Sequence, residues 1–102
     1  MENLVSKIHQ WVLDRNIQTA DSKVQMCKTM EELGELARGL NKGNSELVKD
    51  SIGDVVVTLI AICAQQGVDF NQCLEVAYNE IKDRKGKMIN GIFVKEADMV
   101  HT

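Results

Sequence analysis

The stretch "VKDSIGDVVVTLIAIC" (residues 48–63) decides which fold the chain takes. Its β-branched run over residues 55–57 is, by itself, typical of a strand. The run lies inside a longer pattern, in which apolar residues recur at spacings of four, three, four and three: Val48, Ile52, Val55, Leu59 and Ile62. That spacing is the period of an amphipathic helix and not of a strand. The stretch therefore predicts a long helix that starts near Ser45 and ends at Gly67.

The same periodicity predicts three more helices, over residues 3–15, from residues 21–22 to residues 41–44, and from residue 69 or 71 to residue 81. Gly43 is a natural left-handed stop for the second of the four helices. The second helix carries an apolar stripe: Met26, Met30, Leu33, Ala37 and Leu40. In the fourth helix, Leu74, Ala77, Tyr78 and Ile81 are expected to face inward. Residues 87–102 are expected to form an irregular tail.

We therefore expect one all-α domain over residues 1–102, with a four-helix-bundle-like architecture. Residues 55–62 are apolar nearly all round, which exceeds what three neighbouring helices can cover. A chain of 102 residues also buries a modest share of its surface by itself. Both features predict that oligomerisation, as a homodimer or homotetramer, completes the fold.

Composition argues against several classes of function. The net charge of −3 argues against nucleic acid binding through a basic surface. The longest apolar run, residues 55–64, is about half of the ~20 residues that span a bilayer, and the N-terminus lacks a signal-peptide pattern. The three cysteines show no CxxC or Cys/His spacing, as expected in a reduced cytoplasm.

Two helices carry carboxylates at helical spacings. Glu31, Glu32 and Glu35 share one face of the second helix, and Asp50 and Asp54 share one face of the third. A short turn joins these helices, so they are expected to be antiparallel neighbours with Glu32 and Glu35 nearly level with Asp54. Converging carboxylates repel each other, and oxygen ligands favour Mg²⁺ or Mn²⁺.

A purely structural explanation competes with the metal site, because acidic helix faces are usually solvated. On that explanation, Glu35 pairs with Arg38 three residues later. Gly34 and Gly53 lie inside helices, where glycine costs about 1 kcal/mol. They suggest that another backbone or a ligand approaches closely.

The stretch "EELGELARGLNKGNSELVKDSIGDVVVTLIAICAQQGVD" (residues 31–69) resembles the core of the MazG-like, all-α nucleoside triphosphate pyrophosphohydrolases. That family's pattern is EExxE followed by ExxD on the next helix. Glu31, Glu32 and Glu35 match the first part, and Asp54 matches the end of the second. Ser51 stands where the pattern has glutamate, and Asp50 is the neighbouring carboxylate.

The resemblance implies a Mg²⁺-dependent enzyme that cleaves a nucleoside triphosphate to the monophosphate and pyrophosphate. Glu32, Glu35 and Asp54 would hold the metal, with Mn²⁺ as an alternative ion. Glu31 or Asp50 would orient or deprotonate the attacking water.

Further residues are candidates for contacts with the substrate: Lys28, Lys82 and Lys85 for phosphate, Asn79 for sugar or base, and Trp11 for stacking on a base. Each has a structural alternative. Lys28 can be an ordinary surface lysine and Trp11 a core residue, and the basic cluster 82–87 can interact with a helix dipole.

Two other classes of function compete with the enzyme. One is a non-catalytic helical interaction or regulatory module with a degenerate metal site, which Ser51 favours. The other, a ferritin-like metal carrier, is disfavoured because such sites use Glu-x-x-His and neither histidine is so placed.

Overall fold

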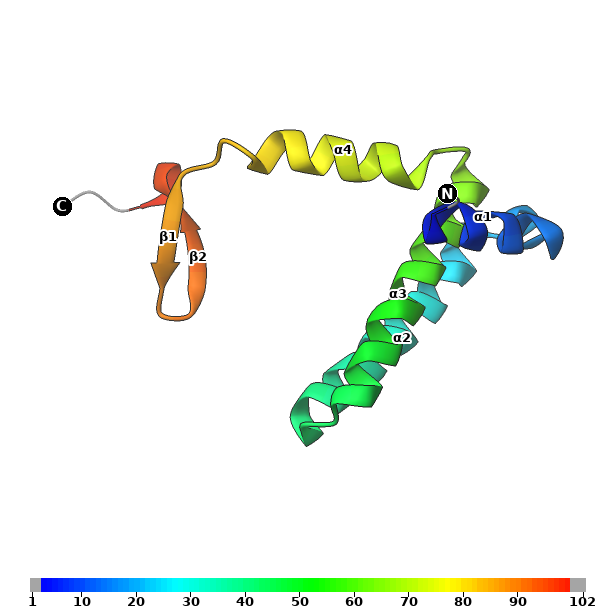
Figure 1. Ribbon diagram of the computed structural model, residues 1–102, viewed down its shortest axis with the longest axis horizontal. Coiled ribbons are helices and arrows are strands. Elements are labelled where there is room, and N and C mark those ends of the chain that lie inside the picture. The colour runs from blue at the N-terminus through cyan, green and yellow to red at the C-terminus, as the bar shows by residue number, and fades with distance from the viewer. Residues whose placement is uncertain (1–2, 100–102) are drawn as a thin grey trace. The chain divides into compact units, whose positions relative to one another are not determined.

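The computed structural model describes residues 3–99. It contains four α-helices, two short 3₁₀ helices and one β-hairpin (Figure 1): α1 (Leu4–Asp14), η1 (Ile17–Thr19), α2 (Ser22–Lys42), α3 (Ser45–Gln66), α4 (Phe70–Ile81), β1 (Gly86–Ile89), β2 (Ile92–Lys95) and η2 (Glu96–Asp98). The predominance of helix confirms the all-α class. The chain divides into two compact units, Met1–Asn71 and Gln72–Thr102. A single domain over residues 1–102 stays a prediction.

Local signals set the helix ends of the first unit. Asp21 and Asn44 cap α2 and α3, because their side-chain oxygens accept hydrogen bonds from the amides of Lys23 and Leu47, at 2.8 and 3.1 Å. Gly43 and Gly67 end the same two helices in the left-handed conformation, with φ of 65° and 68°. Both glycine stops are as predicted.

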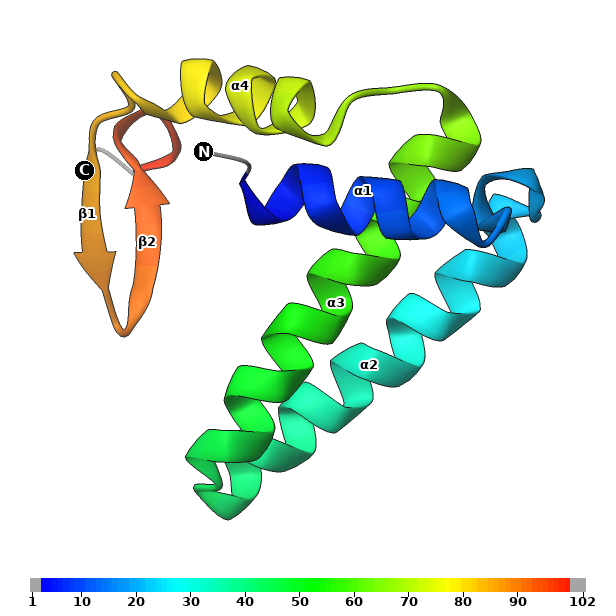
Figure 2. The ribbon, with the colours of Figure 1, turned by 45° about the vertical axis from the view of Figure 1, so that its right-hand side comes forward.

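Helices α2 and α3 pack side by side as an antiparallel pair (Figure 2). Thr29 Oγ1 donates a hydrogen bond of 2.9 Å to Thr58 Oγ1, and both residues are buried. Towards one end of the pair, Ser22 Oγ donates to Gln65 Oε1 at 2.8 Å. Towards the other end, Gly39 lies against Val48, where an added Cβ would be 3.1 Å from the Val48 nitrogen. Small and polar residues therefore set the register of the seam, with the side chains of Leu47 and Val48 against Gly39.

The apolar stripe of α2 lies outside this seam. All five of its members are exposed: Met26, Met30, Leu33, Ala37 and Leu40. Thr29 and Gly39 are the buried residues of α2 instead. No other backbone approaches Gly34 or Gly53, because no described atom lies within 4 Å of a Cβ added at either; close approach of a ligand there stays a prediction.

Helix α1 packs on α3 and forms the apolar core of the first unit with it (Figure 2). Val12 of α1 and Ile60 of α3 are almost completely buried, and Ala61 and Cys63 are buried beside them. Among residues 3–99, no helix is long and apolar enough to cross a membrane.

The second unit contains the largest departure from the prediction. The expected irregular tail is wrong over residues 87–95, because β1 and β2 pair as an antiparallel hairpin with Ile89 opposite Ile92; residues 100–102 of that tail lie outside the described residues. Asn90 and Gly91 make the turn with φ of 52° and 79°. Two left-handed residues in a row define the two-residue turn that matches strand twist, so Asn-Gly is the physical reason for the hairpin.

Helix α4 also differs from the prediction. Leu74, Ala77, Tyr78 and Ile81, which were expected to face inward, are all exposed, and α4 has no buried residue. Asp69 caps its start by accepting a hydrogen bond of 3.2 Å from the Asn71 amide.

Candidate functional site

The predicted carboxylates lie on the α2–α3 pair, and the seam fixes their register. Thr29 pairs with Thr58 and Gly39 with Val48, so each step forward along α2 matches one step back along α3. By this register Glu32 is level with Val55, beside Asp54, and Glu35 is level with Ile52. The sequence prediction that these glutamates lie level with Asp54 is therefore confirmed.

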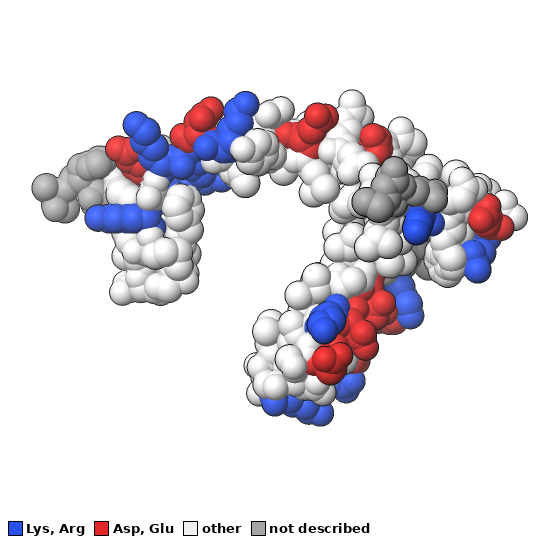
Figure 3. Space-filling view, viewed as in Figure 1, with Lys and Arg blue, Asp and Glu red and all other residues white. Residues whose placement is uncertain are grey.

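Acidic side chains gather on one face of the α2–α3 pair, with basic side chains around them (Figure 3). Lys28, Glu32 and Glu35 follow each other at spacings of four and three on α2, so they form one row. Glu32 and Glu35 are half-buried, whereas Asp50 and Asp54 are exposed.

Two of the glutamates already have partners. Arg38 Nη2 forms an ion pair with Glu35 Oε2, and Lys28 Nζ lies 3.4 Å from Glu31 Oε2. Such exposed pairs contribute little to stability, because solvent screens them. Lys28 therefore lies beside the acidic face. This position fits both an ordinary surface lysine and a phosphate ligand.

The donor set suits a hard divalent cation, since it offers carboxylate oxygens from two facing helices. Within residues 3–99, however, no three acidic, histidine or cysteine side chains come close enough together to hold a metal. The helices bring Glu32, Glu35 and Asp54 to one level without gathering them into a ligand group. Their role as metal ligands stays a prediction.

Ser51 occupies the position where a metal-binding glutamate was expected from the family pattern. Its side chain is buried in the α3 face toward α2, with 2% of the residue exposed. Asp50 is exposed on the adjacent side of the helix. The structure thus leaves Asp50, and not Ser51, accessible to an ion or a water molecule.

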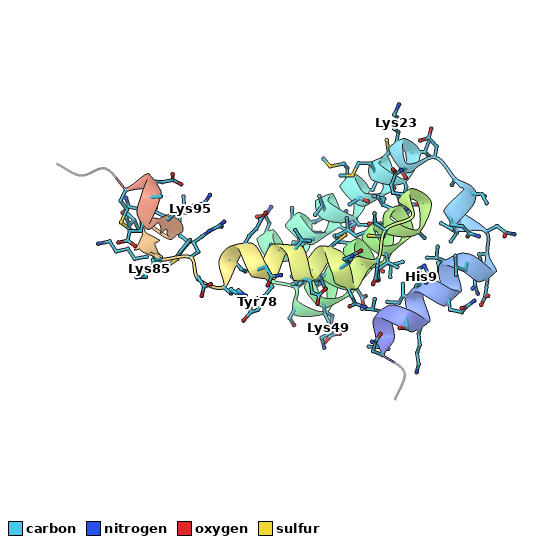
Figure 4. The ribbon with its side chains drawn as sticks, turned by 90° about the horizontal axis from the view of Figure 1, so that it is seen from above. His9, Lys23, Lys49, Tyr78, Lys85 and Lys95 are labelled. Carbon is cyan, nitrogen blue, oxygen red and sulfur yellow. The ribbon has the colours of Figure 1, made fainter. Side chains whose placement is uncertain are left out.

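The remaining candidates are spread over both units. The Arg15 guanidinium lies 4.4 Å from the centre of the Trp11 ring, so one face of this half-exposed indole is covered. Asn79, Lys82 and Lys85 belong to the second unit and are exposed; Lys85 is labelled in Figure 4.

A cavity of about 520 Å³ in the first unit was not anticipated. It lies between α1 and the C-terminal half of α3 and continues to the start of α4. His9, which Figure 4 labels on α1, is one of its lining residues. No pattern in the sequence pointed to this site, because residues 9 and 60–71 are brought together only by the packing of α1 on α3.

Comparison with known proteins places these features in a family. Residues 19–89, more than half of the chain, match the model of the MazG nucleotide pyrophosphohydrolase domain. An uncharacterized 18.2 kDa protein in the rep-hol intergenic region of Haemophilus phage HP1 (strain HP1c1) is 37% identical over 70 residues. That match covers 68% of this chain but 43% of the phage protein, so the chain spans less than half of its relative. No solved structure matches significantly. The match over residues 19–89 shows that the chain belongs to the MazG nucleotide pyrophosphohydrolase family, and its four helices agree with that membership.

Proposed function

We propose that the chain is a divalent-metal-dependent nucleoside triphosphate pyrophosphohydrolase, which releases a nucleoside monophosphate and pyrophosphate. The observation that carries the proposal is the register of α2 and α3, which sets Glu32 and Glu35 level with Asp54 on one acidic face. Family membership supports the reaction class. A nucleotide substrate implies action in the cytoplasm, where removal of unwanted nucleotides is a fitting role.

The ligands that we propose for Mg²⁺, or for Mn²⁺, are Glu32, Glu35 and Asp54. When bound, the ion supplies positive charge to the phosphate oxygens as the anhydride breaks. Glu35 must leave Arg38 to bind an ion, which is a small cost because that pair is exposed.

Glu31 and Asp50 are the proposed bases. One of them accepts a proton from a water molecule as the water oxygen bonds to phosphorus. The bond between the bridging oxygen and that phosphorus breaks, and the bridging oxygen leaves on the other product. Asp50 is well suited to this step, because it is exposed one turn from Asp54.

Positive and planar side chains are proposed to bind the rest of the substrate. Lys28 lies beside the acidic row and would contact a phosphate. Lys82 and Lys85 would also contact a phosphate by their charge, and Asn79 would contact the sugar or base through its amide. The uncovered face of Trp11 remains available for stacking.

We also propose that the chain works as a homodimer or homotetramer. The apolar stripe of α2 supports this proposal, because it is exposed from Met26 to Leu40. Met30, for example, is 58% exposed. A second copy is a natural cover for an apolar face of this length. Light scattering that gives 11.4 kDa at micromolar concentration would contradict the proposal.

The decisive experiment is to incubate the chain with each ribo- and deoxyribonucleoside triphosphate and Mg²⁺, and to identify the products. Monophosphate with pyrophosphate supports the proposal. Diphosphate with phosphate, or no reaction with any nucleotide, contradicts it. The second outcome would favour the non-catalytic interaction module, which the buried Ser51 and the ungathered carboxylates leave as the second candidate.

A further inference from the structure

The cavity between α1 and α3 is a built pocket. Its volume of about 520 Å³ is within the range of small-molecule sites, roughly 300–1,000 Å³. All of its lining residues belong to the first unit. Ile60 and Cys63, both buried, contribute to an apolar lining with Val68 and Phe70.

Polar side chains complete this lining. Ser6, His9 and Gln10 come from α1, and Asp69 and Asn71 come from the start of α4. Two of these side chains already have partners, because Gln10 donates to Asp14 and Asp69 accepts from the Asn71 backbone amide. Among the described residues, the side chains of His9, Ser6 and Asn71 make no hydrogen bond to the protein, although the Ser6 backbone amide does. An amide, an imidazole and a hydroxyl offer donors and acceptors together. A lining that mixes apolar and polar groups in similar measure suits a planar heterocycle that carries both donors and acceptors.

The pocket adjoins the acidic face along α3. Asp50, Val57 and Ala64 are seven residues apart and therefore lie nearly in line on that helix. Ala64 lines the pocket, so this row runs from the acidic face to the pocket wall. Along the helix axis, Asp54 and Ala64 are separated by about 15 Å at 1.5 Å per residue. A nucleoside triphosphate is also an extended molecule, with its sugar between the phosphates and the base. Its phosphates can therefore lie at the acidic face while its base enters the pocket.

We propose that this pocket, in place of Trp11, binds the nucleobase of the substrate, with His9, Ser6 and Asn71 as the residues that select the base; Trp11 does not line the pocket. The inference rests on the proposed function for the identity of the substrate, but base binding is measurable without hydrolysis. Phe70 and His9 supply aromatic rings of the kind on which bases stack. The side-chain amide of Asn71 offers both a donor and an acceptor, so it can distinguish bases by the donors and acceptors on their edges.

The test uses the full chain and deoxyadenosine, deoxyguanosine, deoxycytidine and thymidine, which carry no phosphate and need no metal. Binding is followed by the ring-proton NMR signal of His9, which a His101→Ala variant identifies. We expect at least one nucleoside to shift this signal. Ala64→Leu, which fills the pocket, and Asn71→Ala should weaken that binding about tenfold, the effect of one lost hydrogen bond or contact.

The same variants are then assayed with the triphosphate that the chain hydrolyses. Ala64→Leu, Asn71→Ala and His9→Ala should raise KM about tenfold and leave the Mg²⁺-dependent change in Tm unaltered. Lys7→Ala is the matched control, because Lys7 is exposed on α1 and does not line the pocket. Circular dichroism checks that each variant keeps its helices.

The outcomes separate this inference from the proposed function. Nucleoside binding without any hydrolysis supports the pocket and contradicts the enzyme. Hydrolysis with wild-type KM in all three pocket variants overturns the pocket and leaves the enzyme standing. The His9 signal could instead shift when the protein concentration is changed and stay constant when nucleoside is added. That result would assign the cavity to contacts between copies of the chain and would also overturn the proposal.

Discussion

Replacing Thr29 by valine removes one hydroxyl from the α2–α3 seam and keeps the shape of the side chain. The hydrogen bond that is lost, 2.9 Å from Thr29 Oγ1 to Thr58 Oγ1, is buried. A neutral hydrogen bond contributes about 1 kcal/mol net. The Thr58 hydroxyl is not orphaned, because it still donates to the Val55 carbonyl at 2.7 Å. We therefore expect Thr29→Val to lower the free energy of unfolding by about 1 kcal/mol and no more.

Thr58→Val should cost a similar amount or less, because the Thr29 hydroxyl also lies 3.2 Å from the Gln25 carbonyl. The double variant Thr29→Val/Thr58→Val replaces both partners by apolar groups of the same shape, which can be nearly neutral. Its cost should fall short of the sum of the two single costs by about 1 kcal/mol, the coupling energy of the pair.

The assay is urea unfolding followed by circular dichroism, at one fixed protein concentration because self-association changes apparent stability. The single variants should also lose about 4–8 °C in Tm, the shift expected per kcal/mol in a domain of this size. Additive costs, within about 0.3 kcal/mol, would show that the hydroxyls do not interact. The register that sets Glu32 level with Asp54 would then lose its main support.

Four further predictions concern the site and the hairpin. Asp54→Asn should abolish pyrophosphate release and Asp50→Asn should lower it, since one is a proposed ligand and the other a proposed base; wild-type rates in both would remove the acidic face from the reaction. Mg²⁺ at a hundredfold excess over its Kd should stabilise the chain by about 2.7 kcal/mol, and this gain should vanish in Glu35→Gln; identical Tm values with Mg²⁺ and with chelator would count against a preformed site. Ser51→Glu should lower stability in metal-free buffer by more than about 1 kcal/mol, because it puts a carboxylate where 2% of the residue is exposed; an unchanged urea midpoint would show that the seam opens there. Gly91→Ala should strain the turn by roughly 1–2 kcal/mol, because φ is 79°; hydrogen exchange of the β1 amides should rise, and unchanged exchange would contradict the assigned turn.

Local chemistry made much of the fold predictable. The helix ends at Asp21, Gly43, Asn44 and Gly67 follow from residues that act on their own backbone, and the structure has all four. The hairpin was predictable in the same way. Asn90-Gly91 stands between two apolar groups, which is a strong short-range turn signal, and the expectation of an irregular tail overlooked it.

Other features depend on partners that are distant in sequence. The period of Met26, Met30 and Leu33 shows that α2 has an apolar stripe, but not what covers it. The face that packs on α3 is chosen by contacts such as Thr29 with Thr58, which neither helix specifies alone. The pocket beside His9 exists only after α1 has packed on α3. The level of the carboxylates was predictable, because a short turn between helices of similar length fixes it.

The contacts that set the register of α2 and α3 are separate from the exposed apolar stripe of α2. A hydroxyl pair and a glycine contact are selective about register, since they are lost when one helix slides. Half-buried Leu47 and Val48 lie in the same seam and add apolar burial there. The stripe from Met26 to Leu40 lies outside the seam and is exposed. Evolution can therefore retune how strongly this chain associates with another surface by changing the stripe, while Glu32 and Asp54 keep their alignment.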